Sequence, residues 1–270
     1  MSKKSFAAPF LLWIICGTVI PLAVVAYYGF TDRSGTFTFA NLIAMLSAEH
    51  AQALLLSLLL SLISTVICFV IAFPLALILK GSKLGRQGFM VFIFILPMWM
   101  NFLLRTMAWQ VILEKGGLIN GLLGLLHLPP LALINTPAAI VLGMVYDFLP
   151  FMVLPIYNTL MKIDDHIIEA AYDLGATKRK VLTDILLPLS IPGIASGVTM
   201  VFVPSLTTFV ISNMLGGGKI NLIGNIIEQE FTTSSNWNLG SGLSLVMMVF
   251  IVISMAALSK LDKNGEGTLI

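Results

Sequence analysis

The chain has 270 residues, of which 58% are hydrophobic and 10% are charged, and its formal net charge is +2. Soluble domains carry about 25% charged residues, so this composition excludes an ordinary water-soluble globular fold. So small a net charge also gives no support for a protein that binds nucleic acid.

Six mostly apolar stretches follow one another along the chain. A helix needs about 20 apolar residues to cross a hydrocarbon core of about 30 Å, and each stretch reaches that length. Lipid cannot satisfy backbone hydrogen bonds, and the sequence lacks the alternating strands of about ten residues that build a membrane barrel. We therefore predict an all-α, polytopic membrane protein with a single transmembrane domain over residues 1–270. The predicted spans are residues 6–30, 51–79, 89–113, 138–161, 191–214 and 239–260.

The first stretch has an alternative interpretation as a cleaved signal peptide, because Lys3 and Lys4 precede its apolar run. That run is about twice as long as the usual apolar region of a signal peptide and lacks a clear small-residue cleavage site. It also carries Tyr27 and Tyr28 where an interfacial aromatic belt is expected. These features favour a membrane span.

The basic residues indicate how the spans are oriented. Six spans place both termini on one side, and eleven Lys and Arg residues fall on that side against three on the other. The positive-inside rule then predicts that both termini and the loop of residues 162–190 are cytoplasmic. The eleven are Lys3, Lys4, Lys80, Lys83, Arg86, Lys162, Lys178, Arg179, Lys180, Lys260 and Lys263, and the three are Arg33, Lys115 and Lys219.

Two ionisable residues lie deep within predicted spans. Asp147 follows Tyr146 about nine residues into the fourth span, and an ionisable residue at such a place indicates a functional site. Arg105 of the third span lies at a comparable depth if the two spans are antiparallel. Asp147 therefore has two open interpretations, a contact to a transported solute or an ion pair with Arg105. Steps of four residues predict that Asn101, Arg105 and Trp109 share one helical face.

The loop between the fourth and fifth spans begins with a predicted short helix. Asp164 is placed to cap its start, and Gly175 is placed to end it in a left-handed conformation. Ala170 and Ala171 present little side chain, which lets a partner come close, and Glu169 offers a charge at the rim. The pattern predicts a docking surface for a partner outside the bilayer.

A second helix is predicted in the same loop. Thr177 is placed to cap it, and Pro188 interrupts it before the fifth span. The two helices would project at an angle from the membrane face, and an ordinary solvated surface loop is the alternative. The apolar stripe of the second helix consists of Val181, Leu182, Ile185 and Leu186.

The residue pattern of this loop resembles the cytoplasmic coupling loop of ABC importer permeases. That pattern is Glu-Ala-Ala, three residues, Gly, nine residues and Ile-x-Leu-Pro. The resemblance implies the type I ABC importer permease fold, with a helix seated in a cleft of a separate ATPase subunit. Because the sequence contains no phosphate-binding loop, this chain is expected to bind no cofactor and to be no enzyme, with ATP and Mg on the ATPase partner. The matching residues are Glu169, Ala170, Ala171, Gly175, Ile185, Leu187 and Pro188.

Longer stretches resemble the spermidine/putrescine permeases, and among them the PotB type. The resemblance implies polyamine import across a bacterial inner membrane, with four kinds of partner: an ATPase dimer, a second homologous permease, an extracytoplasmic polyamine-binding protein and membrane lipid. Permeases for iron, thiamine or an anion share diluted forms of these stretches and are the alternatives. An ATP-independent carrier or channel is a further alternative, and a membrane enzyme lacks a catalytic cluster in this sequence. The stretches are residues 97–109, 117–120, 149–157, 215–217 and 222–225.

A polyamine would give several intramembrane side chains a role. An ammonium at the bilayer centre costs about 2.5 kcal/mol or more, so its path needs acceptors and aromatic faces. Asp147, Tyr146, Trp109 and Asn101 are the candidates, whereas Arg105 would repel a cation and is expected to be structural. The histidines and cysteines are dispersed along the sequence, so no metal site is expected.

Overall fold

The computed structural model describes residues 10, 12–86, 93 and 95–266. This part of the chain is almost entirely helical, and its β-structure is one isolated bridge between Thr31 and Phe37. The predicted all-α class is therefore confirmed. The chain divides into two compact units, one formed by Met1–Leu54 with Ile223–Val252 and the other by Leu55–Leu222 with Ile253–Ile270.

The first unit joins the two ends of the chain. The Asn238 amide donates hydrogen bonds to the carbonyls of Thr31 at 2.7 Å and Tyr28 at 3.2 Å, and the Asn41 amide donates to the Thr31 carbonyl at 2.8 Å. These amides hold the turn that follows the first span. The helices that begin in this unit are η1 (Ile15–Val19), α2 (Ile20–Gly29), α3 (Ala40–Ile43), η2 (Ala44–Leu46), α4 (Ala48–Gly81), α15 (Ile223–Thr232) and α16 (Trp237–Glu266).

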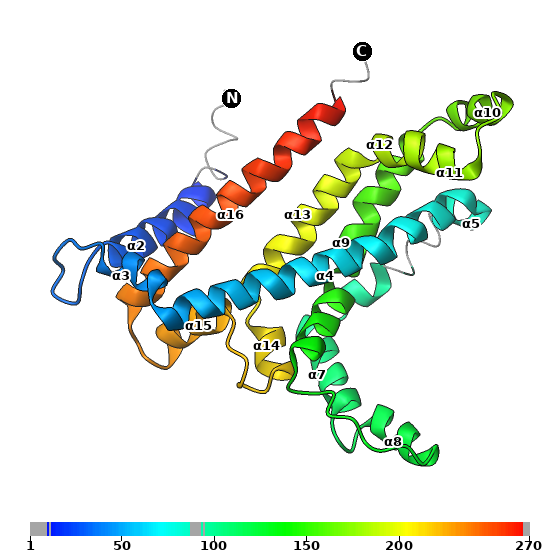
Figure 1. Ribbon diagram of the computed structural model, residues 1–270. Coiled ribbons are helices and arrows are strands. Elements are labelled where there is room, and N and C mark those ends of the chain that lie inside the picture. Colours follow the sequence, from blue (N-terminus) through cyan, green and yellow to red (C-terminus); the bar gives the residue numbers. More distant parts are fainter. Residues whose placement is uncertain (1–9, 11, 87–92, 94, 267–270) are drawn as a thin grey trace. The chain divides into compact units, whose positions relative to one another are not determined.

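The second unit contains most of α4 and the hydrophobic core that positions the candidate site. Its elements alternate between long apolar helices and short helices at their ends (Figure 1). They are α5 (Lys83–Arg86), η3 (Leu96–Trp99), α7 (Phe102–Leu113), α8 (Leu118–Leu125), α9 (Pro137–Lys162), α10 (Asp165–Asp173), α11 (Lys178–Lys180), η4 (Val181–Leu186), α12 (Leu187–Leu189), α13 (Ile191–Thr207) and α14 (Val210–Leu215).

Helices α9 and α13 pack side by side at the centre of the second unit (Figure 1). Gly193 and Gly197 of α13 allow this approach, because a Cβ at Gly193 would lie 2.6 Å from the Pro155 carbonyl oxygen and one at Gly197 would lie 2.8 Å from the Met152 sulfur. Small residues let membrane helices come close without a hydrophobic driving force between them. The central helix pair therefore depends on glycine at two places one turn apart.

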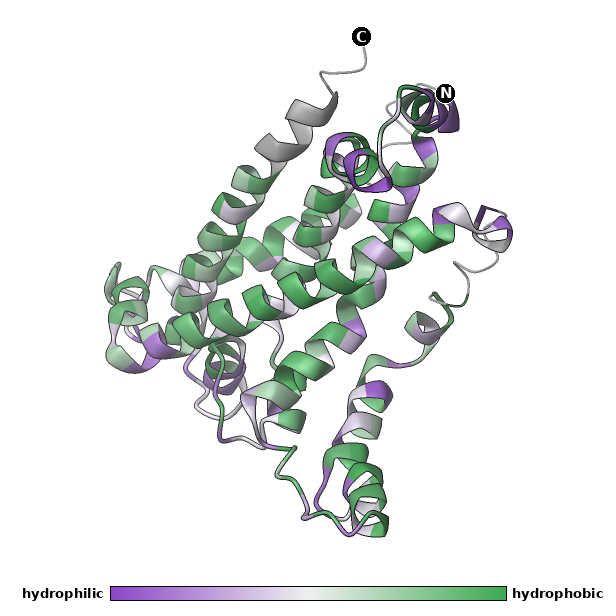
Figure 2. Ribbon diagram, turned by 45° about the vertical axis from the view of Figure 1, so that its right-hand side comes forward, coloured by the Kyte–Doolittle hydropathy of each residue, from purple (hydrophilic) through white to green (hydrophobic). Residues whose placement is uncertain are grey.

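Four helices of the described chain are long and apolar enough to cross a membrane, and they correspond to the predicted first, second, fourth and sixth spans. Figure 2 shows hydrophobic residues along the long helices and hydrophilic residues gathered at turns and helix ends. A fifth membrane-spanning helix is counted if the pair Lys178–Leu189 and Ile191–Thr207, bent by 64°, is taken as one span. The number six and the sidedness of the termini stay predictions. The four helices are Leu12–Gly29, Ala48–Gly81, Pro137–Lys162 and Trp237–Leu258.

The expectation of one continuous helix over residues 89–113 is wrong for the part that the structure describes. The chain is extended at Met100, with ψ of 146°, between η3 and α7. Asn101 causes the restart, because its side-chain oxygen accepts a hydrogen bond from the Leu103 N–H at 2.8 Å and so caps α7. Helix α7 has 12 residues, about 18 Å, and is too short to cross the core alone. Residues 87–92 and 94 lie outside the described residues.

The predicted fifth span, residues 191–214, is also interrupted. Helix α13 ends at Thr207, and α14 begins at Val210 after Thr208 adopts an extended conformation with ψ of 136°. Hydropathy does not detect such a break, because the residues on both sides of it are apolar.

Candidate functional site

Helix α10 is the first helix predicted in the loop of residues 162–190, and its start is capped as expected. The Asp164 carboxylate accepts a hydrogen bond from the backbone N–H of His166 at 3.0 Å. Asp165 places a second carboxylate in the first turn, where the positive end of the helix dipole favours it. The His166 ring nitrogen Nδ1 lies 3.3 Å from the Glu169 carboxylate.

The end of α10 is fixed by Gly175, whose φ is +80°. The N–H groups of Gly175 and Ala176 donate to the carbonyls of Tyr172 and Ala171, both at 2.9 Å. These two bonds form a Schellman motif, which satisfies carbonyls that the helix leaves free. A Cβ at Gly175 would meet nothing within 4 Å, so the left-handed backbone alone requires glycine there. The predicted helix end is confirmed.

The outer face of α10 combines small residues with large apolar ones. Glu169 is 69% exposed and Ala170 is exposed, while Ala171 is half-buried. Leu174 is 90% exposed and Tyr172 is 44% exposed. Sequence reasoning missed these two residues as surface features, although a leucine directly before a helix-ending glycine is a detectable signal. Exposed large apolar side chains beside small ones suit the centre of a protein interface.

The second helix of the loop is divided into α11, the π-helix η4 and α12. The Thr177 hydroxyl accepts a hydrogen bond from the Lys180 N–H at 3.4 Å, so the predicted cap is present. Pro188 lies two residues beyond the end of the π-helix, and a proline has no N–H with which to continue the ordinary helical ladder. The chain then bends by 64° into α13, with Ser190 at the bend.

This second helix has a buried side and an exposed side, as the apolar stripe predicts. Val181 is 1% exposed, and Leu182 and Leu186 pack against the hydrophobic core. Ile185 is half-buried, whereas Leu187 and Pro188 are exposed. Of the coupling-pattern residues in this helix, Ile185 is therefore partly covered, whereas Leu187 and Pro188 are open to a partner.

Asp147 and Arg105 meet in the core of the second unit. The Arg105 Nη2 atom lies 3.3 Å from Asp147 Oδ1, and the side chains are 7% and 1% exposed. The Thr106 hydroxyl donates to Asp147 Oδ2 at 3.3 Å. Arg105 Nε and Nη1 and Asp147 Oδ1 are buried without a hydrogen-bond partner. The two charges are thus in contact but incompletely hydrogen-bonded, which is an expensive arrangement in a buried site.

The other predicted pathway residues are placed differently. Trp109 and Tyr146 meet edge to face, with ring centroids 5.4 Å apart. Both line an apolar pocket of about 680 Å³ that α4 and α9 complete and that Asp147 does not line. Asn101 is exposed and caps α7, so it does not share a continuous helical face with Arg105 and Trp109 as predicted.

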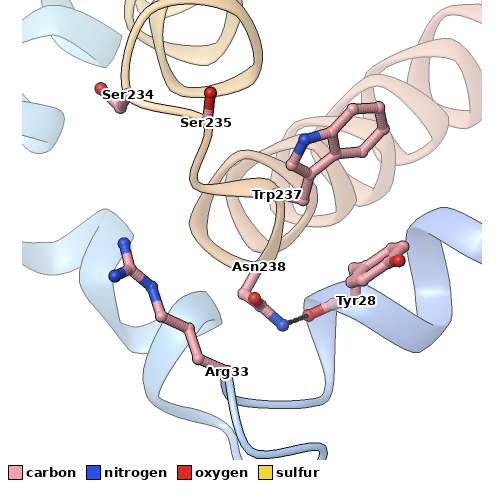
Figure 3. A pocket seen from close by; sticks show the side chains of 6 residues that line it. All are labelled: Tyr28, Arg33, Ser234, Ser235, Trp237 and Asn238. Carbon is pink, nitrogen blue, oxygen red and sulfur yellow. Dashed lines mark hydrogen bonds between the residues drawn. The ribbon is translucent and has the colours of Figure 1, made fainter.

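The first unit contains a separate polar pocket of about 560 Å³ that includes none of the predicted site residues. Figure 3 shows Arg33 at one side of it and the Asn238 amide bonded to the Tyr28 carbonyl. That amide is already engaged in holding the turn, which accounts for its place there. The pocket is lined by Tyr28, Arg33, Ser234, Ser235, Trp237 and Asn238.

The fold and the capped loop define a class of membrane transport subunit. Residues 40–264 match the family described as "Binding-protein-dependent transport system inner membrane component". The match covers most of the chain, which therefore belongs to this family of ABC importer permeases. The protein is accordingly a multi-pass component of an inner membrane.

Among characterised relatives, the chain is similar to the spermidine/putrescine transport system permease protein PotB of Haemophilus influenzae, with 33% identity over 98% of this chain and 96% of that protein. PotB of Escherichia coli is 32% identical over 94% of this chain and 97% of that protein. A chain in the crystal structure of a bacterial ABC transporter involved in the import of the acidic polysaccharide alginate has a TM-score of 0.82 at 16% identity, covering 97% of this chain and 94% of that one. The last similarity concerns the fold alone and agrees with the ABC importer permease fold implied by the sequence.

Proposed function

We propose that the chain is the membrane-spanning permease subunit of an ATP-driven, binding-protein-dependent importer that moves polyamines into the cytoplasm by alternating access. One observation carries the coupling part of the proposal. Helix α10 is a rigidly capped helix whose small and apolar residues are open to a partner, with Leu174 90% exposed. The polyamine part is supported by the nearly full-length similarity to spermidine/putrescine permeases.

In this proposal α10 sits in a cleft of an ATPase subunit. Ala170 and Ala171 let the ATPase backbone approach, Glu169 offers a charge at the rim, and Gly175 sets the exit angle. Ile185 lies half-buried in the following helix, and Leu187 and Pro188 end that helix at the bend into α13. The ATPase dimer would hold ATP and Mg, and its closure would move α10.

The remaining partners follow from the same proposal. A second homologous permease would complete the translocation pathway, and an extracytoplasmic polyamine-binding protein would deliver the solute. Both termini and α10 would lie in the cytoplasm, in keeping with the eleven-to-three distribution of basic residues.

Asp147 is the proposed solute contact within the membrane. A carboxylate compensates an ammonium that has lost its water. The ring of Tyr146, the residue before Asp147, and the Trp109 ring that it contacts offer π-faces to the same cation. In the structure Asp147 contacts Arg105 instead, so the pair must open for a polyamine to bind. The buried N–H groups of Arg105 that lack partners favour opening of the pair, because water or another acceptor could then bind them.

A second candidate solute is an anion, and Arg105 is the observation that favours it. A buried guanidinium with unpaired N–H groups can bind a carboxylate or phosphate. The permease complex would be purified with its ATPase and binding protein, and ATP hydrolysis measured with putrescine, spermidine, thiamine, ferric iron and inorganic phosphate. Stimulation by the two polyamines alone supports the proposal, whereas stimulation by phosphate or by none of the polyamines contradicts it.

The coupling part has its own test with a matched control. Gly175 and Gly218 have φ of +80° and +67°, and a Cβ at either meets nothing within 4 Å. Valine resists the left-handed region by about 1–2 kcal/mol at both positions, but only Gly175 ends α10. We expect Gly175→Val to reduce ATPase co-purification and solute-driven hydrolysis, and Gly218→Val to leave both unchanged. Normal coupling in Gly175→Val would refute the docking role of α10.

A further inference from the structure

The start of α10 is held by a part of the chain that the sequence pattern does not connect with coupling. Residues 80–86, which we call the elbow, comprise the last two residues of α4, the connecting Ser82 and α5. The Arg86 Nη2 atom lies 2.8 Å from Asp165 Oδ2, and the Lys80 Nζ atom lies 3.5 Å from Asp165 Oδ1. Two cations of the elbow therefore share one carboxylate in the first turn of α10.

Lys80 also binds the end of α9. Its side chain is buried, and its ammonium donates to the carbonyls of Leu160 and Ile163, both at 2.8 Å. The last carbonyls of a helix lack intrahelical partners and carry partial negative charge, so a cation is favoured there. With three acceptors around one ammonium, the charge is buried without being left unsatisfied.

The shape of the elbow is fixed by its own contacts. The Arg86 Nε–H donates to the Lys80 carbonyl at 3.0 Å, which folds α5 back on the end of α4. A Cβ at Gly85 would collide with the Leu79 carbonyl oxygen, so this fold-back requires glycine. The Tyr157 hydroxyl of α9 donates to the Gly85 carbonyl at 2.7 Å and ties the folded elbow to α9.

We propose that Lys80, Arg86 and Asp165 are positioning residues that transmit the movement of α10 to α4 as well as to α9. The proposal rests on the proposed function, because it takes α10 as the ATPase contact. Only Ile163 and Asp164 separate α9 from α10, and a free two-residue link would let α10 rock without moving a membrane helix. Lys80 binds the Leu160 carbonyl before the link and the Ile163 carbonyl within it, and Asp165 is bound after it, so the elbow bridges the link.

The test compares two neighbouring cations of α5. Arg86 is half-exposed and bound to Asp165, whereas Lys83 is exposed and forms no ion pair with a described residue. Arg86→Gln, Asp165→Asn and Lys83→Gln would be reconstituted with the ATPase in proteoliposomes, and spermidine moved per ATP hydrolysed would be measured. Arg86→Gln removes one ion pair, which predicts a fall of about fivefold, and Asp165→Asn removes both ion pairs of Asp165, which predicts a fall at least as large. Lys83→Gln is expected to match the parent, and Arg86→Lys to recover at least half of the ratio.

ATPase co-purification distinguishes this proposal from the proposed function. The docking face of α10 is intact in Arg86→Gln, so the amount of bound ATPase should not change while the coupling ratio falls. An equal ratio in Arg86→Gln and Lys83→Gln overturns the proposal. Loss of bound ATPase in Arg86→Gln overturns it too, because Arg86 would then belong to the docking face. An unmodified complex that binds no ATPase would instead contradict the proposed function itself.

Discussion

Lys80 and Arg105 are equally buried cations, each 7% exposed, yet their surroundings are opposite. The Lys80 ammonium has two carbonyl acceptors at 2.8 Å and a carboxylate at 3.5 Å. Arg105 has one carboxylate contact at 3.3 Å, and two of its nitrogens have no hydrogen-bond partner. Backbone carbonyls belong permanently to the helix that carries them, whereas a carboxylate can accept the cation of another molecule. The comparison distinguishes a fixed anchor from an exchangeable contact.

Replacing Arg105 and Asp147 singly and together should have the largest effect on stability. Arg105→Leu leaves the Asp147 carboxylate buried and unpaired, which is expected to cost about 3–5 kcal/mol, and Asp147→Leu should cost a similar amount. The double variant should lie within about 1 kcal/mol of the parent, because two apolar side chains can replace a poorly bonded pair. Thermal unfolding of the parent, the two single variants and the double variant in detergent measures these differences in stability. A double variant as unstable as the single ones would show that the contact is an anchor after all.

Lys80→Met should be destabilising by about 1–3 kcal/mol, chiefly because the Ile163 carbonyl loses its lysine donor, whereas the Leu160 carbonyl keeps the Ile163 N–H. In contrast to the Arg105 pair, a second substitution cannot compensate, because the Leu160 and Ile163 carbonyls remain. Asp165→Leu added to Lys80→Met is therefore expected to restore nothing. Unfolding of these variants would be compared with that of Lys83→Met, which changes an exposed lysine of the adjoining helix. Recovery in the double variant would remove the distinction between the two cations.

Asp147→Asn should reduce polyamine uptake about tenfold, since a charge-assisted hydrogen bond contributes about 1.5–3 kcal/mol. Asparagine keeps the shape of the side chain and a polar partner for Thr106, so assembly with the ATPase and basal ATP hydrolysis should persist. Uptake of labelled spermidine into proteoliposomes is the measurement. Glu49→Gln, which removes an exposed carboxylate, serves as the control, and equal uptake in the two variants would exclude Asp147 from the pathway.

The smallest effect is expected at an exposed charge, Asp32, which serves as a reference for the two buried cations. Hydrogen bonds from the hydroxyls of Ser34 and Thr36, and then from the Thr36 backbone, hold the pKa of Asp32 well below its ordinary value. Because the pKa of Asp32 is lower in the folded state, its ionised carboxylate contributes fully to the free energy of unfolding above its unfolded pKa, about 3.9. That contribution is lost as the pH falls through the lower folded value.

Fluorescence of Trp237, which packs against Tyr28 beside this turn, reports the loss. The signal should be constant from pH 8 to about pH 4 and change only below that range. An Asp32→Asn variant should lack the change at low pH. A transition in the parent near pH 6 would contradict the assignment to Asp32.

Local chemistry explains which parts of the structure the sequence predicts well. The bounds of α4 and α9 lie within a few residues of the predicted spans, because long apolar runs are sufficient to define them. The caps at Asp164 and Gly175 are also predicted correctly, since each depends on residues two to five positions away. Depth along antiparallel helices can be judged from sequence as well, which is why the Arg105–Asp147 contact is one of the two sequence-based interpretations.

The remaining features depend on partners that a sequence does not display. Asn101 is assigned to a helical face by its spacing, yet one side-chain bond to a nearby N–H ends that helix and begins another. In the sequence Lys80 counts only as one of the basic residues that predict the orientation of the spans. Its acceptors are backbone carbonyls 80 and 83 residues further along the chain. Every residue has a backbone carbonyl, so the residue type at position 160 does not predict this contact.

The 80-residue separation between Lys80 and Leu160 has a consequence for biosynthesis. The ribosome completes α4 well before α9 exists, so the Lys80 ammonium is hydrated while the translocon selects the orientation of α4. Only later does the emerging end of α9 remove that water and enclose the lysine. If the predicted orientation holds, one side chain thus contributes first to the insertion of α4 and afterwards to the contact between two finished helices.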